Sequence, residues 1–177
     1  MKVIRYCQIP RQALKRATEQ AEEMIRFVEP VLMRRFRAGY SGLNSLPSIP
    51  LKTQLPPLLY CCGGNLAGKT VLDLGCGSRN NPDEGVFLAP RIFEPWLCRT
   101  LLLLGANPIG IDVRDNSHER FESHRADVSS DSLGFLPRGI GVINAYNFFN
   151  APSFTGNLKE VTERFEQFAS RGFFLYE

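Results

Sequence analysis

The residues best suited to chemistry lie in one short run, Thr70-Val71-Leu72-Asp73-Leu74-Gly75-Cys76-Gly77. Apolar residues flank an acid and a Gly-x-Gly pair follows, as expected where a buried parallel strand enters a tight turn. Glycine lacks a Cβ and adopts positive φ, so a ligand can lie close against this backbone. We expect the Asp73 carboxylate at the strand's carboxyl end, in the crevice where open α/β sheets bind ligands. Its charge suits a cationic ligand.

The placement of Asp73 disfavours a dinucleotide-binding loop. A Gly-x-Gly-x-x-Gly loop holds an anionic pyrophosphate at a helix N-terminus. Here Asn80 takes the third glycine position, and a carboxylate before the first glycine would repel a pyrophosphate. A nicotinamide-dependent oxidoreductase is therefore a weaker interpretation. An ordinary strand and turn without a ligand is the structural alternative.

Two further runs place an acid at the end of a predicted strand. Residues 105–112 form a turn and a short apolar strand that ends in Asp112. In doubly wound folds an acid at this position hydrogen-bonds ribose hydroxyls. Residues 121–128 contain a third predicted strand, which ends at Asp127. Three acids thus end three successive predicted strands.

These runs resemble the motifs of the class I S-adenosylmethionine (SAM) dependent methyltransferases, and the resemblance covers residues 70–177. It implies that SAM is the cofactor and that Asp112 contacts its ribose. It also implies that Asp127 and the backbone N–H of Val128 contact its adenine. The predicted cofactor-binding residues are Asp73, Gly75, Cys76, Gly77, Asp112, Val113, Asp127 and Val128.

In that family the segment after the fourth strand, here predicted at residues 139–146, faces the transferring methyl group. The sequence Asn150-Ala151-Pro152-Ser153 partly matches the Asn/Asp-Pro-Pro-Tyr/Phe motif of DNA and protein amide methylases, but it lacks the aromatic residue. The candidate catalytic residues are Tyr146, Asn147 and Asn150. No general base is assigned, because displacement at a sulfonium methyl needs mainly positioning and desolvation.

The expected function is methyl transfer from SAM to an unidentified acceptor. A non-catalytic or truncated SAM-binding regulatory protein is the alternative. Nine Lys or Arg and four Glu make residues 1–40 basic, so a nucleic-acid or acidic partner is a second, weakly supported expectation. The basic residues of this region do not share one helical face, and a helical cap on the sheet is the preferred interpretation.

The spacing of the acids departs from the family pattern in two places. Asp73 and Asp112 lie farther apart than is usual, and the excess is an insertion at residues 78–94. A lid over the cofactor and a solvated insertion are the two interpretations left open. Asp112 and Asp127 are only 15 residues apart. This leaves little room for a full helix, so we expect a turn at residues 116–119.

The N-terminal region has apolar residues that recur at intervals of three and four, which predicts an amphipathic helix. They are Leu14, Ala17, Ala21, Met24, Ile25, Val28, Leu32 and Phe36. Pro30 predicts the start of a second helical segment. Residues 41–57 contain four prolines and three serines, which favours a surface linker.

Together these elements predict an α/β fold with a doubly wound, mostly parallel sheet of strand order 3-2-1-4-5. A helical extension and proline-rich linker (1–57) would precede a SAM-binding Rossmann-like domain (58–177). The last two strands of the family's usual sheet are missing, which would leave residues 172–176 at an edge. An exposed apolar edge recruits other chains. Cover by the N-terminal helix or a homodimer is therefore expected.

The remaining composition indicates a cytoplasmic enzyme. Five cysteines without a Cys-x-x-Cys pair indicate neither a disulfide framework nor a zinc site, and no metal is expected. The first residues lack a signal-peptide pattern, and the apolar stretch at 96–104 is too short to cross a bilayer, so no membrane association is expected.

Overall fold

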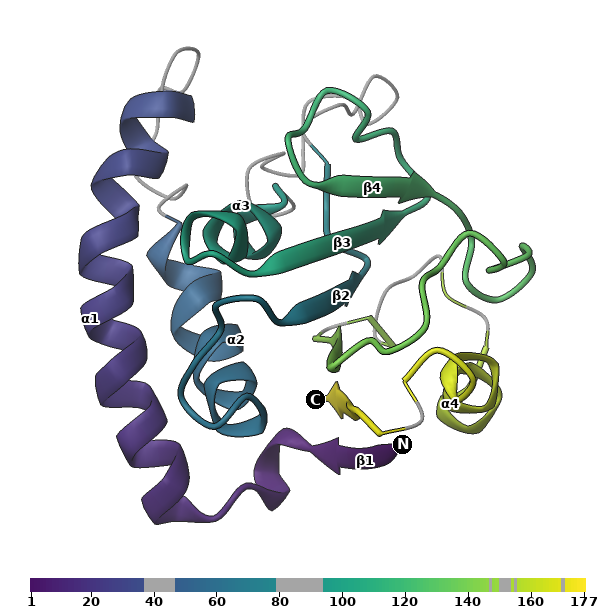
Figure 1. Cartoon of the computed structure of the whole chain (residues 1–177), viewed down its shortest axis with the longest axis horizontal. Coiled ribbons are helices and arrows are strands. Elements are labelled where there is room, and N and C mark those ends of the chain that lie inside the picture. Colours follow the sequence, from purple (N-terminus) through teal and green to yellow (C-terminus); the bar gives the residue numbers. More distant parts are fainter. Residues whose placement is uncertain (37–46, 79–93, 147, 150–153, 155, 170) are drawn as a thin grey trace.

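A computed structural model describes residues 1–36, 47–78, 94–146, 148–149, 154, 156–169 and 171–177. Within these residues, six parallel strands form one sheet in the order β1-β6-β5-β2-β3-β4 (Figure 1). The strands are β1 (Lys2–Arg5), β2 (Thr70–Leu74), β3 (Asn107–Asp112), β4 (Glu122–Arg125), β5 (Val142–Ala145) and β6 (Phe173–Tyr176). The α/β class predicted from the sequence is confirmed.

The strand order differs from the prediction by the addition of β1. The predicted order 3-2-1-4-5 corresponds to β4-β3-β2-β5-β6, and β1 pairs beyond β6 with Lys2 opposite Phe173. The expectation that residues 172–176 form an edge is therefore wrong. The homodimer was expected only because of that exposed edge, so this argument for it no longer applies. The strand escaped detection because only Ile4 of its four residues is buried, which is a weak signal in so short a segment.

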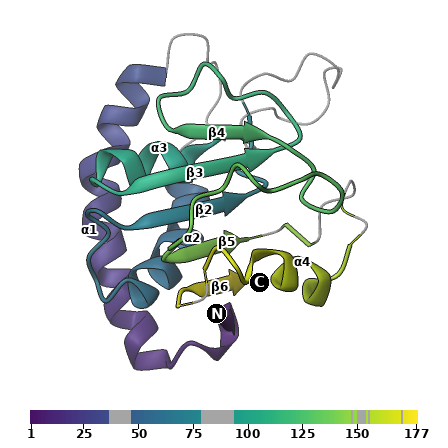
Figure 2. The ribbon, with the colours of Figure 1, turned by 45° about the vertical axis from the view of Figure 1, so that its right-hand side comes forward.

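Helices cover both faces of the sheet. They are α1 (Arg11–Phe36), α2 (Ser48–Cys61), α3 (Trp96–Leu103) and α4 (Leu158–Phe165), with a 3₁₀ helix, η1, at Tyr6–Gln8. The first three share a hydrophobic cluster with Val71 and Val142. Alternate strand residues, such as Leu72 and Ile143, belong to a second cluster with α4. Figure 2 shows α1, α2 and α3 on one side of the sheet and α4 on the other.

The helix α1 runs without a break through Pro30, so the predicted second helical segment is wrong. Pro30 is exposed, whereas Val28 and Leu32 on either side are fully buried. Their packing compensates for the hydrogen bond that a proline removes. The predicted apolar stripe of this helix is confirmed by the burial of Ala17, Ala21, Ile25, Val28 and Leu32.

The proline-rich segment also differs from its prediction. Its described part is not a surface linker but forms most of α2, with Pro56 and Pro57 inside the helix. Four of its leucines are fully buried, and α2 packs against α1: Leu51, Leu55, Leu58 and Leu59. Burial between α1 and the sheet thus outweighs the poor helical propensity of proline.

The predicted turn at residues 116–119 is confirmed, and a polar side chain caps α4. The N–H of Glu119 donates to the carbonyl oxygen of Asn116 at 2.9 Å, which closes a turn at 116–119. The side chain of Asn157 accepts from the N–H of Glu160 at 3.0 Å and caps α4. In the described part of the chain, no helix is both long and apolar enough to cross a membrane.

Candidate functional site

The candidate site lies where the sheet reverses its direction of growth. The chain passes from β2 to β3 and β4 on one side, then returns to place β5 and β6 on the other side of β2. Open α/β sheets bind ligands at such a switch point, outside the carboxyl ends of the strands. The segments that leave β2, β3 and β5 therefore form the candidate site.

The loop after β2 turns sharply over the end of β3. Gly75 and Gly77 have φ angles of 66° and 84°, a conformation that favours glycine. The N–H groups of Gly75 and Cys76 both donate to the carbonyl oxygen of Ile111, at 2.8 and 3.1 Å. The glycine-rich run identified from the sequence is thus a fixed turn at the switch point.

Asp112 connects this loop to the end of β3. Its Oδ2 accepts from the N–H of Gly77 at 2.9 Å, and its Oδ1 accepts from the N–H of Arg114 at 3.0 Å. The side chain is half-buried. Each carboxylate oxygen has a further acceptor position. Asp112 therefore both holds the loop and retains capacity to bind hydroxyl groups.

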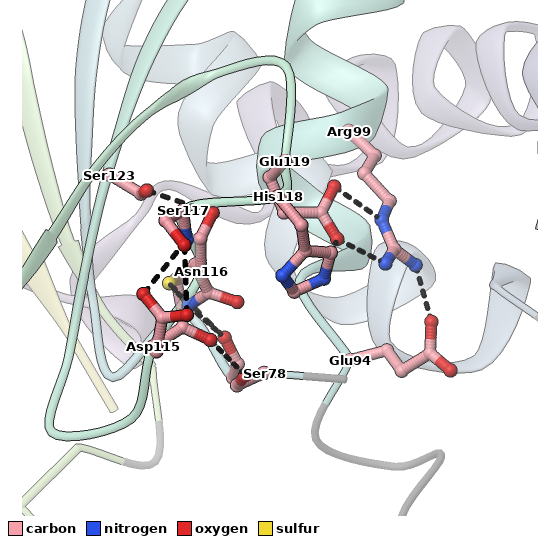
Figure 3. A network of polar contacts seen from close by, with 11 residues as sticks. Ser78, Glu94, Arg99, Asp115, Asn116, Ser117, His118, Glu119 and Ser123 are labelled. Atoms are coloured by element: carbon pink, nitrogen blue, oxygen red, sulfur yellow. Dashed lines mark hydrogen bonds and ion pairs between the residues drawn. The ribbon is translucent and has the colours of Figure 1, made fainter. Parts of the chain in front are cut away.

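Asn116 is a site residue that sequence reasoning missed. It is 4% exposed, and its Nδ2 donates to the carbonyl oxygen of Gly77 at 2.8 Å. Its Oδ1 has no hydrogen-bond partner in the described part of the chain. Ser78 and Ser123 hold the backbone on both sides of it (Figure 3). The sequence identified only the turn, because an unpaired buried oxygen is visible only in three dimensions.

Asp73 is buried at the carboxyl end of β2 and is only 4% exposed. Its Oδ1 accepts from Nδ2 of Asn144 on β5 at 2.7 Å, and the Cys98 thiol of α3 lies 3.8 Å from its Oδ2. Burial raises the pKa of this carboxyl from 3.8 to about 7, although the hydrogen bond from Asn144 opposes the rise. The acid expected on the crevice surface is thus enclosed between β5 and α3.

The third acid also follows its strand, but its contacts are local. The Asp127 Oδ1 accepts from the Oγ and N–H of Ser129, at 2.5 and 2.8 Å, and these bonds lower the pKa of Asp127. Val128 is buried in the core and Val113 is 49% exposed. The N–H of Ala126 donates to the carbonyl oxygen of Asp112. The carboxyl ends of β3 and β4 therefore lie side by side.

Among the candidate catalytic residues, only Tyr146 lies in the described part of the chain. It directly follows β5, is half-buried and stacks on Tyr6, with ring centroids 5.5 Å apart. Asn147, Asn150 and residues 79–93 of the predicted insertion lie outside the described residues.

A buried ion-pair network connects α3 with the segments next to the site. Arg99 of α3 forms ion pairs with both Glu94 and Glu119 (Figure 3). Its guanidinium group lies 4.9 Å from the Trp96 ring centroid. Burial raises the pKa of Glu94, opposed by Arg99. The sequence showed Arg99 only as a charge within an apolar helix. The network attaches α3 to the turn that carries Asn116.

The fold and its switch point thus define an α/β protein with a parallel sheet and a glycine-rich turn above β2. Comparisons with protein-family models, with curated proteins and with solved structures find no match. The function must therefore be inferred from the site itself.

Proposed function

We propose that this protein binds SAM at the carboxyl ends of β2 and β3 and transfers its methyl group to an acceptor that is not identified. The observation that carries the proposal is the Gly75–Gly77 turn held by Asp112 at the switch point. We also propose that the protein carries out this reaction in the cytoplasm.

The described residues fit such a cofactor. Each Asp112 oxygen accepts one backbone N–H group and keeps a further acceptor position, which supports a contact with ribose hydroxyls. The unpaired Oδ1 of Asn116, beside Gly77, is an acceptor that a bound ligand would satisfy. Gly75 and Gly77 adopt the positive φ that the turn requires, and a Cβ on Gly75 would meet the Phe148 ring at 3.2 Å. Bound SAM supplies an activated methyl group, so the chain's own task is to orient the acceptor and exclude water.

When ionised, the buried Asp73 carboxylate places a negative charge beneath the proposed SAM site. Its carboxyl has a pKa of about 7, so a cation bound nearby favours ionisation and releases a proton. Binding of SAM near pH 7 should therefore release more protons from the wild type than from Asp73→Asn. Calorimetry in phosphate and Tris buffers measures this release. An equal release in both proteins contradicts the role of Asp73.

The ribose contact is tested with Asp112→Ala. Loss of hydrogen bonds to a charged group weakens SAM binding by more than about tenfold, at roughly 1.5–3 kcal/mol per bond. Glu163→Ala, an exposed change on α4, is the control. Unchanged SAM affinity in a folded Asp112→Ala protein contradicts the ribose assignment, and absence of SAM binding to the wild type contradicts the whole proposal.

Transfer is tested with tritiated-methyl SAM against pools of metabolites, RNA and protein. Labelled product from any pool supports the enzyme. Tight SAM binding without product from any pool favours the alternative, a SAM-binding regulatory protein.

A further inference from the structure

A cavity of about 410 Å³ lies beside the switch point. It is lined by residues from η1, α1, α2 and the ends of three strands: Arg5, Tyr6, Cys7, Leu14, Thr18, Lys52, Thr53, Pro56, Pro57, Tyr146 and Glu177. Small-molecule sites in proteins commonly have volumes of roughly 300–1,000 Å³. The cavity is thus large enough for one small ligand.

The sheet register explains why these residues meet. Arg5 of β1, Tyr176 of β6 and Ala145 of β5 are aligned in one row across the sheet. The next residue along each chain segment, Tyr6, Glu177 or Tyr146, lines the cavity. The cavity is therefore built by the carboxyl ends of adjacent parallel strands, which is the edge where such sheets bind ligands.

Two aromatic rings form one wall of this cavity. Tyr6 and Tyr146 are stacked with an angle of 25° between their planes. The Tyr6 hydroxyl donates to Oδ1 of Asn144 at 2.5 Å, and Asn144 is the residue that donates to Asp73. This chain of hydrogen bonds fixes the Tyr6 ring against β5 and links it to Asp73 on β2, the strand that precedes the glycine-rich turn. A rigid wall of two rings favours a flat ligand.

The charges in the cavity favour an acidic ligand. Arg5 and Lys52 are exposed and form no ion pair with any described residue, whereas Glu177 is the one acid among the lining residues. Pro56, Pro57 and Leu14 add apolar surface. The lining thus combines apolar walls with two basic side chains and one acidic side chain.

We propose that this cavity is the acceptor site and that it binds a small aromatic or heteroaromatic acid stacked against Tyr6 and Tyr146. The acidic group, a carboxylate or a phosphate, pairs with Arg5 and Lys52. The acceptor role rests on the proposed function, because Tyr146 leaves β5 at the switch point where SAM is proposed to bind. Binding of the ring acid itself does not depend on SAM.

The test uses NMR titrations of the full chain, with amide shifts near residues 6 and 146 as the readout. Benzoate and phenyl phosphate separate a carboxylate from a phosphate ligand. Benzyl alcohol keeps the ring without the charge, and cyclohexanecarboxylate keeps the charge without the aromatic ring. We expect one of the two aromatic acids to bind at least about fivefold more tightly than either of the last two probes.

Two variants assign the binding to this cavity. Tyr146→Ala removes a stacking surface and should weaken the aromatic acid about tenfold. Lys52→Met should weaken it about two- to fivefold and leave benzyl alcohol unchanged. Lys159→Met removes an exposed charge on α4 and is the control. It should leave the affinity for the aromatic acid unchanged. Because Lys52 is exposed, its variant remains informative if Tyr146→Ala does not fold.

Each outcome decides between the two proposals. Ring-acid binding that Lys52→Met weakens supports the cavity assignment. SAM binding to the wild type without ring-acid binding here overturns the cavity and leaves the proposed function standing. Ring-acid binding without any SAM binding overturns the acceptor role together with the proposed function.

Discussion

Replacing Asp73 by asparagine should change how the stability of this protein depends on pH. The side chain is buried, and burial raises the pKa of its carboxyl from 3.8 to about 7. Asparagine keeps an oxygen that can accept the 2.7 Å hydrogen bond from Asn144. The variant therefore removes the titration while it preserves the shape and the main contact of the side chain.

The size and sign of the effect follow from the two pKa values. Between pH 3.8 and about 7 the unfolded chain loses the Asp73 proton while the folded chain retains it. The wild type therefore loses stability as pH rises through this window, and the loss is complete above about pH 7. The full difference is about 4 kcal/mol, of which about 3 kcal/mol falls between pH 4.5 and 8.

Urea unfolding at pH values from 4.5 to 8.5 measures this effect. We expect Asp73→Asn to gain about 3 kcal/mol relative to the wild type across that range. Glu23→Gln, which makes the same charge change on the exposed face of α1, should follow the wild type. Parallel curves for wild type and Asp73→Asn would show that the Asp73 pKa is not raised, and the physical account of this carboxyl would be wrong.

Two further changes test the packing around the site. Arg99→Met removes the guanidinium group that pairs with two buried carboxylates and should lower the free energy of unfolding by about 3–5 kcal/mol, measured by urea unfolding. Gly110→Ala places a Cβ 2.8 Å from Cys76 Sγ and from the Phe121 ring, so it should cost about 1–3 kcal/mol. Gly134→Ala, whose nearest neighbour would be 3.6 Å away, is its control, and equal effects of the two would contradict this packing.

The sequence predicted the central sheet because each of its strands carries a signal of its own. The run at 70–77 and the run ending at Asp112 combine apolar residues, glycine and a terminal acid, and the structure has strands at both places. The short connection at 116–119 followed from chain length alone. Such features are local, so they can be recognised in the sequence without knowledge of the tertiary structure.

The missed elements depend on tertiary packing. Four leucines of the proline-rich helix α2 are helical because α1 and the sheet enclose them, which no local propensity reveals. Likewise β1 has one buried residue and is a strand only because β6 lies beside it. In the site, Asp112 and the glycines were found by their pattern. Asn116, Tyr6 and the Arg99 network were not, because their partners are distant in sequence.

The pairing of β1 with β6 also bears on how the chain folds during synthesis. Lys2 lies opposite Phe173, so β1 leaves the ribosome 171 residues before its partner. Contacts of such separation are slow to form, because a long loop must close before they contribute. Since Tyr6 follows β1 directly, the wall that it forms with Tyr146 is completed only when β1 has paired with β6. The cavity should therefore form as a late step of folding, after β6 has been synthesised.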